Sequence, residues 1–402
     1  MTRVWGAMIV TALVVLTASV ASAQQPAEAK PEEKPKTLLE EIALFGYVEN
    51  SYVWNLGHTS SDSFGLTSAR QVNTLRLYDS DEGYTFNMAE ISVKKDPSDK
   101  YPFGFGLVIT GGEDTQKNHS VGIFRDLEDA PRQTKQVDLQ EAYLSYKVPL
   151  GSGLTLKAGK FVTLLGYEVI ESPNNLNFSR SLLFSFAIPL THTGGLLSYS
   201  FTDWFSVTAG VVEGWDVSDD NNASPAYTGQ FALTPLKDLS TALNWIVGPE
   251  QNGNDTRQRW VTDLTANYAG FKNVTLGANV DVGGEEKVPS LVATRRDGDA
   301  SWWGWALYAA YDWTEKLRTA VRLEYFDDPE SVRTAIRPAG NRTSLYEVTA
   351  TVQYKIWKGL VGRLEYRHDD ANAKVFAIRA PGYVPTGTGQ DTISVDLYYL
   401  FF

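Results

Sequence analysis

Residues 303 to 313 alternate so regularly that few folds can accommodate them. One parity has aromatic rings at both ends and aliphatic residues between them: Trp303, Trp305, Leu307, Ala309, Tyr311 and Trp313. The other parity is small or polar: Gly304, Ala306, Tyr308, Ala310 and Asp312. Six positions spaced two apart span about 33 Å of strand and, at a tilt of about 45°, roughly 23 Å of membrane thickness. The segment therefore predicts a strand that crosses a bilayer with rings at both interfaces and its other face toward an interior.

The first 23 residues indicate export. They carry Arg3, an apolar run from Met8 to Leu16, and the small residues Ala21-Ser22-Ala23 before Gln24. This pattern predicts a signal peptide over residues 1–23 that is removed on maturation. The alternative is an uncleaved anchor, for which the apolar run is short. No later stretch approaches eighteen consecutive apolar residues, so the mature chain is expected to be either a barrel or a secreted soluble protein.

Composition limits the partners further. Residues 24–43 begin with QQPAEAKPEEKPK and predict a disordered periplasmic tail, because such a composition cannot bury a core. The formal net charge is −12, and removal of Arg3 with the signal makes it −13, which argues against binding to nucleic acid. The chain has no cysteine, and its four histidines are not in a metal-ligand spacing with one another. We therefore expect no cofactor and no metal site.

The alternation continues through residues 44–402, which we assign to a transmembrane barrel. The pattern predicts strands at 45–54, 84–95, 101–112, 136–148, 153–163, 190–201, 204–214, 227–235, 239–248, 258–269, 273–283, 302–313, 317–327, 343–356, 359–369 and 391–401. The strand at 343–356 again has rings, Tyr346 and Tyr354, at both ends of its apolar parity. With the rings of 303–313, these residues predict the aromatic girdles that flank a lipid-facing belt.

The connections between these strands fall into two classes. Short turns, such as Asp96–Lys100 and Thr314–Lys316, alternate with polar loops of roughly ten to thirty residues. An even number of strands with short periplasmic turns and long external loops is typical of single-chain bacterial barrels. The fold class expected is therefore an all-β, antiparallel, up-and-down transmembrane barrel of about sixteen strands.

The last strand resembles the C-terminal signature that the barrel-assembly machinery recognises. Its apolar parity, Ile393, Val395, Leu397, Tyr399 and Phe401, ends one residue before the terminal Phe402. Either the signature is read one residue out of phase or the strand carries a bulge.

Two further stretches carry a resemblance to a family. These are Gly46-Tyr47-Val48-Glu49-Asn50-Ser51-Tyr52, and the region from Leu139 to Asp216 with its elements AGKF, LGYE, NLNFSR and PLTHTG in that order. Together they resemble the OmpL-like β-barrel porin family of Gram-negative bacteria. The resemblance implies a passive channel in the outer membrane, surrounded by lipid and lipopolysaccharide, but it names neither a solute nor a constriction residue.

The third long loop, from Leu164 to Pro189, is the best candidate for a constriction. A barrel of sixteen strands leaves an aqueous channel unless something narrows it. This loop contains Leu182, Leu183, Phe184 and Phe186, which suit a segment folded against the inner wall. Glu168, Glu171 and Arg180 would then border the narrowest point. The alternative is an external loop in contact with lipopolysaccharide or a neighbouring subunit.

Charged residues on the inward parity of three late strands complete the predicted lining. They are Arg318, Arg322, Lys355, Arg363 and Arg367, with Glu324, Glu347 and Glu365. One interpretation is a basic wall that faces the acidic residues of the third loop and creates a transverse field across the pore. The other is that these charges pair across adjacent strands and hold the wall together.

The function expected is therefore a porin for small hydrophilic solutes or ions. A plugged or structural barrel is the first alternative. A barrel-embedded hydrolase is weaker, because the chain has no G-x-S-x-G elbow and no preferred nucleophile and base. A secreted carbohydrate-binding protein fits the aromatic content but not the rings at both ends of the strands. A homotrimer is compatible with sixteen strands, although no subunit interface can be recognised in the sequence.

Overall fold

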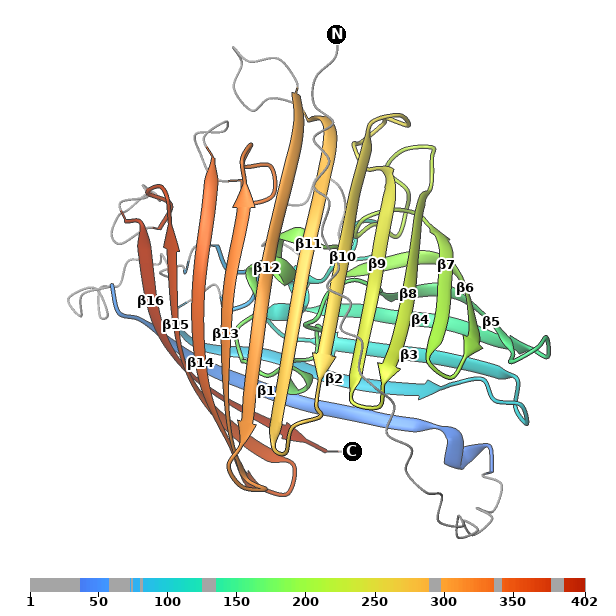
Figure 1. The fold of residues 1–402 in the computed structure, drawn as a ribbon, viewed down its shortest axis with the longest axis horizontal. Helices are drawn as coiled ribbons and strands as arrows, with labels where there is room; N and C mark the ends of the chain where they lie inside the picture. Colours follow the sequence, from blue (N-terminus) through green and yellow to red (C-terminus); the bar gives the residue numbers. More distant parts are fainter. Residues whose placement is uncertain are drawn as a thin grey trace, which may run out of the picture. The chain divides into compact units, whose positions relative to one another are not determined.

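The alternating segments form the wall of a closed antiparallel barrel (Figure 1). The computed structural model describes residues 37–57, 73, 75–79, 82–124, 135–288, 298–335, 342–376 and 387–401. The predicted signal peptide, most of the predicted tail and Phe402 lie outside these residues. Before the first strand, Leu39–Glu41 form a short helical turn, η1.

Sixteen strands are present in the described residues. They are β1 (Ala43–Asn55), β2 (Gly83–Lys95), β3 (Phe103–Gly111), β4 (Val137–Val148), β5 (Leu154–Val162), β6 (Thr191–Thr202), β7 (Phe205–Val212), β8 (Ala226–Leu236), β9 (Leu239–Pro249), β10 (Gln258–Tyr268), β11 (Val274–Val288), β12 (Gly298–Asp312), β13 (Leu317–Asp328), β14 (Thr343–Trp357), β15 (Leu360–Ala371) and β16 (Gly389–Leu400). The predicted fold class is confirmed, and the predicted strands coincide with these within a few residues.

Each strand pairs with its neighbours in sequence, and β1 pairs with β16 to close the ring. The register of β1 on β16 runs from Tyr47 opposite Leu400 to Asn55 opposite Thr392. Over the described residues, β16 shows no register shift against β1 or β15, so the bulge considered for the last strand is not observed there. The register shifts instead between β1 and β2 at Glu49/Asn50, where Asn87 of β2 is the extra residue, and between β3 and β4 at Val108/Ile109, where Gln140 of β4 is the extra residue.

The two ends of the barrel differ in their connections. Turns of a few residues join β2 to β3, β4 to β5 and every second pair after that, at the end where β1 begins and β16 finishes; we call this the turn end. The long connections lie at the opposite end, the loop end. Short helical turns occur only within these long connections and before β1, as far as the structure describes the chain: η2 (Asp114–Lys117), η3 (Ser172–Asn174) and η4 (Leu183–Ala187). In the same residues, no helix is long and apolar enough to cross a membrane.

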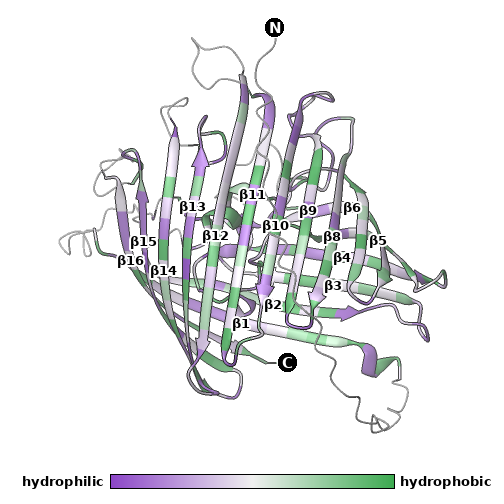
Figure 2. Cartoon of the chain, viewed as in Figure 1, coloured by the Kyte–Doolittle hydropathy of each residue, from purple (hydrophilic) through white to green (hydrophobic). Residues whose placement is uncertain are grey.

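Side-chain exposure follows the predicted parity. Along β12, Trp303, Leu307 and Tyr311 are 41%, 48% and 40% exposed, whereas Trp302, Ala306 and Tyr308 on the other face are almost fully buried. Figure 2 shows apolar and polar residues alternating along the strands in the same way. The exposed apolar set covers the outside of the barrel, so the buried core lies inside it, where inward side chains meet the third loop.

Candidate functional site

The third loop, residues 163–190 between β5 and β6, lies inside the barrel. The backbone N–H groups of Phe178 and Ser179 donate to the Glu365 carboxylate at 2.7 and 3.0 Å, and that of Leu182 donates to Glu324 at 2.7 Å. Both glutamates are inward side chains of the wall, on β15 and β13. Figure 1 shows the helical turn of this loop within the ring of strands, and η4 contacts both β11 and β12.

Apolar packing explains why this loop occupies the interior. Leu182, Leu183 and Phe184 are all at least 97% buried. Gly304 on β12 makes room for Leu183, since a Cβ at position 304 would lie 2.6 Å from Leu183 Cδ2. The indole N–H of Trp302, also on β12, donates to the Ala187 carbonyl at 3.2 Å. The loop therefore has a hydrophobic reason to lie against β11 and β12.

Arg322 on β13 connects this loop to the wall. Its guanidinium lies 2.7 Å from Glu168 Oε1 of the loop, 2.7 Å from Glu324 Oε1 of its own strand and 3.0 Å from Glu347 Oε2 of β14. It also donates to the Ser179 carbonyl at 2.6 Å. All four charged side chains are buried, so the loss of any one of them would leave a costly uncompensated charge.

Arg363 and Arg367 on β15 make equivalent connections. Arg363 pairs with Asp396 of β16 at 2.7 Å and Glu49 of β1 at 2.9 Å, and its guanidinium also donates to the Ser172 carbonyl. Arg367 pairs with Asp369 at 2.8 Å and donates to the Arg180 carbonyl at 2.7 Å. The wall thus has the cross-strand pairs of the second interpretation, and in Arg322–Glu168 it also has a basic wall residue that faces an acidic residue of the third loop, as in the first.

Arg180 itself holds the third loop in shape. Its guanidinium donates to the carbonyls of Val169, Ile170 and Phe178, all within the loop. Glu168, besides its pair with Arg322, accepts the Ser181 N–H at 2.6 Å, and Glu171 accepts Gln140 of β4 at 2.8 Å. Burial raises the pKa of Glu171, and the nearby Glu141 adds to this effect.

Two of the predicted lining residues lie apart from this group. Arg318 sits near the turn end, where it is half-exposed and pairs with Asp312 of β12 at 2.7 Å. Lys355 is exposed near the same end of β14. The structure therefore brings Arg322, Arg363, Arg367, Glu324, Glu347 and Glu365 together with the loop, but not Arg318 or Lys355.

The first long loop also contributes to this group, although no pattern in its sequence indicated it. Arg76 pairs with Asp369 of β15 at 2.6 Å and with Asp79. Tyr78 packs its ring on Phe184 of the third loop at 5.9 Å, and the Arg180 guanidinium lies 4.9 Å from the Tyr78 ring centre. The available signal was weak, because Arg76 and Tyr78 stand in a polar loop without the apolar run that marks the third loop.

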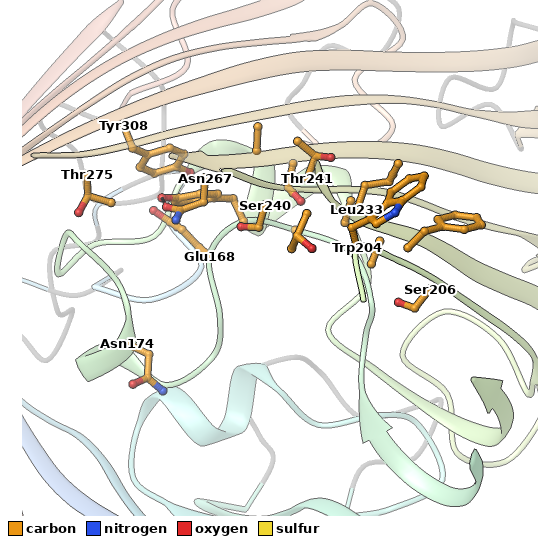
Figure 3. Close-up of a pocket in the computed structure, with 18 of the residues that line it drawn as sticks. Glu168, Asn174, Trp204, Ser206, Leu233, Ser240, Thr241, Asn267, Thr275 and Tyr308 are labelled. Atoms are coloured by element: carbon orange, nitrogen blue, oxygen red, sulfur yellow. Dashed lines mark hydrogen bonds between the residues drawn. The ribbon is translucent and has the colours of Figure 1, made fainter. Parts of the chain in front are cut away.

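A cavity of about 670 Å³ remains between the third loop and the wall on the turn side. It is bordered by Gly166–Glu168 and Asn174–Leu176 of the loop and by parts of β6 to β13. In Figure 3, Glu168, Asn267 and Tyr308 lie together at one end, Trp204 and Ser206 lie toward the other, and Asn174 stands across from them. The lumen is therefore partly filled and partly open.

The predicted girdle residues are placed on the outside of the barrel at two levels. Trp303 and Tyr346 lie near the loop end, and both contact Tyr325, with ring centres 5.1 and 4.9 Å away. Tyr311, Trp313 and Tyr354 lie near the turn end and are exposed, while Trp305 is half-buried.

A buried carboxyl group fastens the fourth long loop, residues 213–225, at the loop end. Glu250, just beyond β9, accepts the Trp215 N–H at 2.8 Å. Burial raises the pKa of Glu250 to about 7, and the nearby Arg259 acts in the opposite direction. Among the described residues, no group of three or more histidine or carboxylate side chains is arranged to hold a metal ion.

Comparisons with known proteins give the following relationships. A model of the family described as "Putative beta-barrel porin-2, OmpL-like" matches residues 41–401. Similar solved structures include OmpF of Salmonella typhi in complex with daunomycin, which is 15% identical with a TM-score of 0.56 and covers 90% of this chain and 97% of that one. The anion-selective porin from Comamonas acidovorans is 12% identical with a TM-score of 0.55, covering 90% and 99%.

The in-vitro folded trimer form of the outer-membrane protein OmpT of Vibrio cholerae is 12% identical with a TM-score of 0.53, covering 90% of this chain and 99% of that one. At these identities the likeness to solved structures establishes the fold alone. The comparison with curated proteins gave no match.

Proposed function

Because the chain belongs to the OmpL-like β-barrel porin family, we propose that it is an outer-membrane porin whose passive diffusion channel is narrowed by the third loop. The solutes are small and hydrophilic, or ions. The observation that carries the proposal is the cavity of about 670 Å³ between the third loop and the wall of the barrel. A barrel of this size leaves a water-filled channel unless segments inside it narrow the path.

The predicted lining residues take two roles in this proposal. One group fixes the loop so that the width of the path stays constant: Glu168, Glu171, Arg180, Arg322, Glu324, Glu347, Arg363, Glu365 and Arg367. Arg318 and Lys355, at the turn end, border the wider part of the path. The first group supports the proposal because its ion pairs and loop contacts are direct and buried.

The same proposal includes location and assembly. The barrel lies in the outer membrane of a Gram-negative bacterium, with the loop end outward against lipopolysaccharide and the turn end in the periplasm. The barrel-assembly machinery inserts it through the last strand. A homotrimer is part of the proposal, and the trimer form of the similar OmpT supports it only through the shared fold.

Planar-bilayer recording of the purified, refolded protein tests the channel directly. We expect stepwise conductance that scales with salt concentration, and swelling of liposomes in small hydrophilic solutes. Folding is checked beforehand by heat-modifiable gel mobility. A correctly folded protein that gives no conductance and no swelling would overturn the proposal.

That outcome would favour the second candidate, a plugged or structural barrel. A specific observation supports this candidate, because Tyr78 of the first loop packs against Phe184 of the third. The cavity extends on the turn side of the third loop, so a plug would have to close the path at the loop end. The bilayer recording separates the two candidates.

A further inference from the structure

The part of the lumen left open is lined very differently from the part that the third loop covers. Five consecutive strands, β7 to β11, each contribute at least one hydroxyl residue to the cavity, among them, in strand order, Ser206, Thr234, Ser240, Thr265 and Thr275. We call these five residues the hydroxyl wall. Ser206, Ser240 and Thr275 are labelled in Figure 3 along the cavity.

Charged groups that border the cavity are already engaged or lie at its mouth. Among the described lining residues, the charged ones are Glu168, Asp203 and Arg318. Glu168 pairs with Arg322, and Arg318 pairs with Asp312 through two hydrogen bonds of 2.7 and 2.9 Å. Asp203 is exposed in the turn between β6 and β7. An ion that enters the cavity loses hydration water, and few fixed charges in the lining compensate for that loss.

Aromatic rings complete the lining at the loop side. Tyr167 and Tyr308 stack with ring centres 4.3 Å apart and planes 23° apart, and both border the cavity. The Tyr167 hydroxyl donates to Asn267 Oδ1 at 3.0 Å. Gly277 permits this placement, because a Cβ there would lie 2.3 Å from the Tyr167 ring. A rigid ring pair beside hydroxyl and amide groups offers apolar contact and hydrogen bonds at one site.

From this lining we propose that the cavity selects uncharged polyhydroxylated solutes, of the size of a monosaccharide or disaccharide, over ions of similar size. Hydroxyl groups of such a solute can exchange hydrogen bonds to water for bonds to the hydroxyl wall and Asn267, at little net cost. Its C–H faces can lie against the tyrosine pair. Small-molecule pockets of about 300–1,000 Å³ are usual, and the volume of about 670 Å³ lies within this range. The inference rests on the proposed channel function and specifies its solute.

Three solutes of nearly equal size test this selectivity. Liposomes containing the refolded protein are assayed for swelling in D-glucose, in gluconate and in glucosamine, which differ chiefly in charge. We expect D-glucose to enter fastest, and addition of sucrose to reduce the ionic current in planar bilayers. Equal or faster entry of gluconate or glucosamine would overturn the inference while leaving the channel intact. Absence of both swelling and conductance would instead overturn the proposed function and the inference together.

An isosteric variant tests whether the neutral lining causes the selectivity. Asn267→Asp keeps the acceptor for the Tyr167 hydroxyl and adds one negative charge to the cavity. We expect the permeability ratio of K⁺ to Cl⁻ to rise about fivefold or more, which one charge in an interior of effective dielectric about 20 is sufficient to produce. The entry of glucosamine relative to D-glucose should rise with it.

Asn252→Asp is the matched control, because it makes the same change at an exposed position of the loop end. It should leave both ratios close to those of the unaltered protein. Equal shifts in the two variants, or no shift in Asn267→Asp, would show that the cavity is not on the path of the solutes. Thr265→Asp on the hydroxyl wall provides a second charged variant if Asn267→Asp fails to fold, and the same shift is expected.

Discussion

Arg322, a single inward charge, is expected to determine both the stability of the barrel and the position of the third loop. Three carboxylates from three parts of the chain, Glu168, Glu324 and Glu347, meet its guanidinium within 3.0 Å. In Arg322→Met these carboxylates lose their shared cation in a buried place. Removing one partner of a buried ion pair usually costs about 3–5 kcal/mol, so we expect a clear loss of stability in urea unfolding of the lipid-reconstituted protein. The loop should also be released, which trypsin cleavage after Arg180 would detect.

Arg318→Met is the control for this change. Arg318 pairs with Asp312 where both side chains are more than a third exposed, so its loss should cost less than about 1 kcal/mol. Equal destabilisation by the two substitutions would contradict the role given to Arg322.

Glu250 should make the stability of the loop end depend on pH. Burial raises the pKa of Glu250 to about 7, so the folded protein holds this proton at pH values where the unfolded chain has released it. The stabilising effect of the proton is present at low pH and is lost as the pH rises from about 4.5 through about 7. Glu250→Gln keeps an acceptor for the Trp215 N–H but does not titrate.

The measurement compares thermal unfolding of the two proteins from about pH 5 to about pH 8. Relative to Glu250→Gln, the unaltered protein should lose stability across this interval, by up to about 3 kcal/mol. A constant difference between the two proteins, or a difference of the opposite sign, would refute the prediction.

At the scale of elements, we expect that the third loop can be deleted without disrupting the pairing of the strands. Val162 of β5 pairs directly with Thr191 of β6, so residues 163–190 can be replaced by a Gly-Ser turn of about four residues. We expect the barrel to fold, because its strand ladders do not use the loop, and the single-channel conductance to rise about twofold or more as the lumen widens. Shortening residues 251–257 between β9 and β10 serves as the control and should change conductance little.

The strands could be predicted from the sequence because both of their faces are constrained. Lipid requires an apolar outward parity and the lumen accepts a small or polar inward one, so the period of two is visible in segments such as 303–313. Prediction fell short at β11 and β12, which extend to Val288 and back to Gly298, beyond the predicted limits of 283 and 302. Gly283-Gly284 and Glu285-Glu286 interrupt the alternation there, although the two strands continue to pair.

The candidate site was less accessible to prediction than the strands. Inward parity identified Arg322, Arg363 and Arg367, but the partners of Arg363, Glu49 of β1 and Asp396 of β16, depend on which strands meet and at what register. The hydroxyl wall is built from five strands, each contributing one unremarkable serine or threonine, so no local pattern marks it. A contact that forms only when the strands close into a ring cannot be recognised from the spacing of residues along the chain.

At the scale of the whole molecule, the barrel reverses the arrangement of a soluble protein, because its exterior is apolar and its interior is polar. The outward apolar side chains are exposed here because lipid, rather than protein, is their expected environment. Residues of two loops lie against the inward charges, as the pairs Arg76–Asp369 and Arg322–Glu168 show. Selectivity then depends on what those loops leave uncovered, which is why the neutral cavity matters more than the net charge of the chain.

Placement of the barrel in a bilayer makes a depth-dependent prediction. Leu307 lies at the middle of the outward face of β12, and Leu236 lies on the outside at the turn end of β8; both are about half-exposed or more. In lipid, Leu307→Arg should destabilise the folded protein by about 2–4 kcal/mol, and Leu236→Arg by about 0–1 kcal/mol, since the cost of a charge is greatest at the mid-plane. Reversible urea unfolding in liposomes, followed by tryptophan fluorescence, measures both. On a surface in contact with water the two substitutions would cost the same small amount, so equal values would show that this belt does not face hydrocarbon.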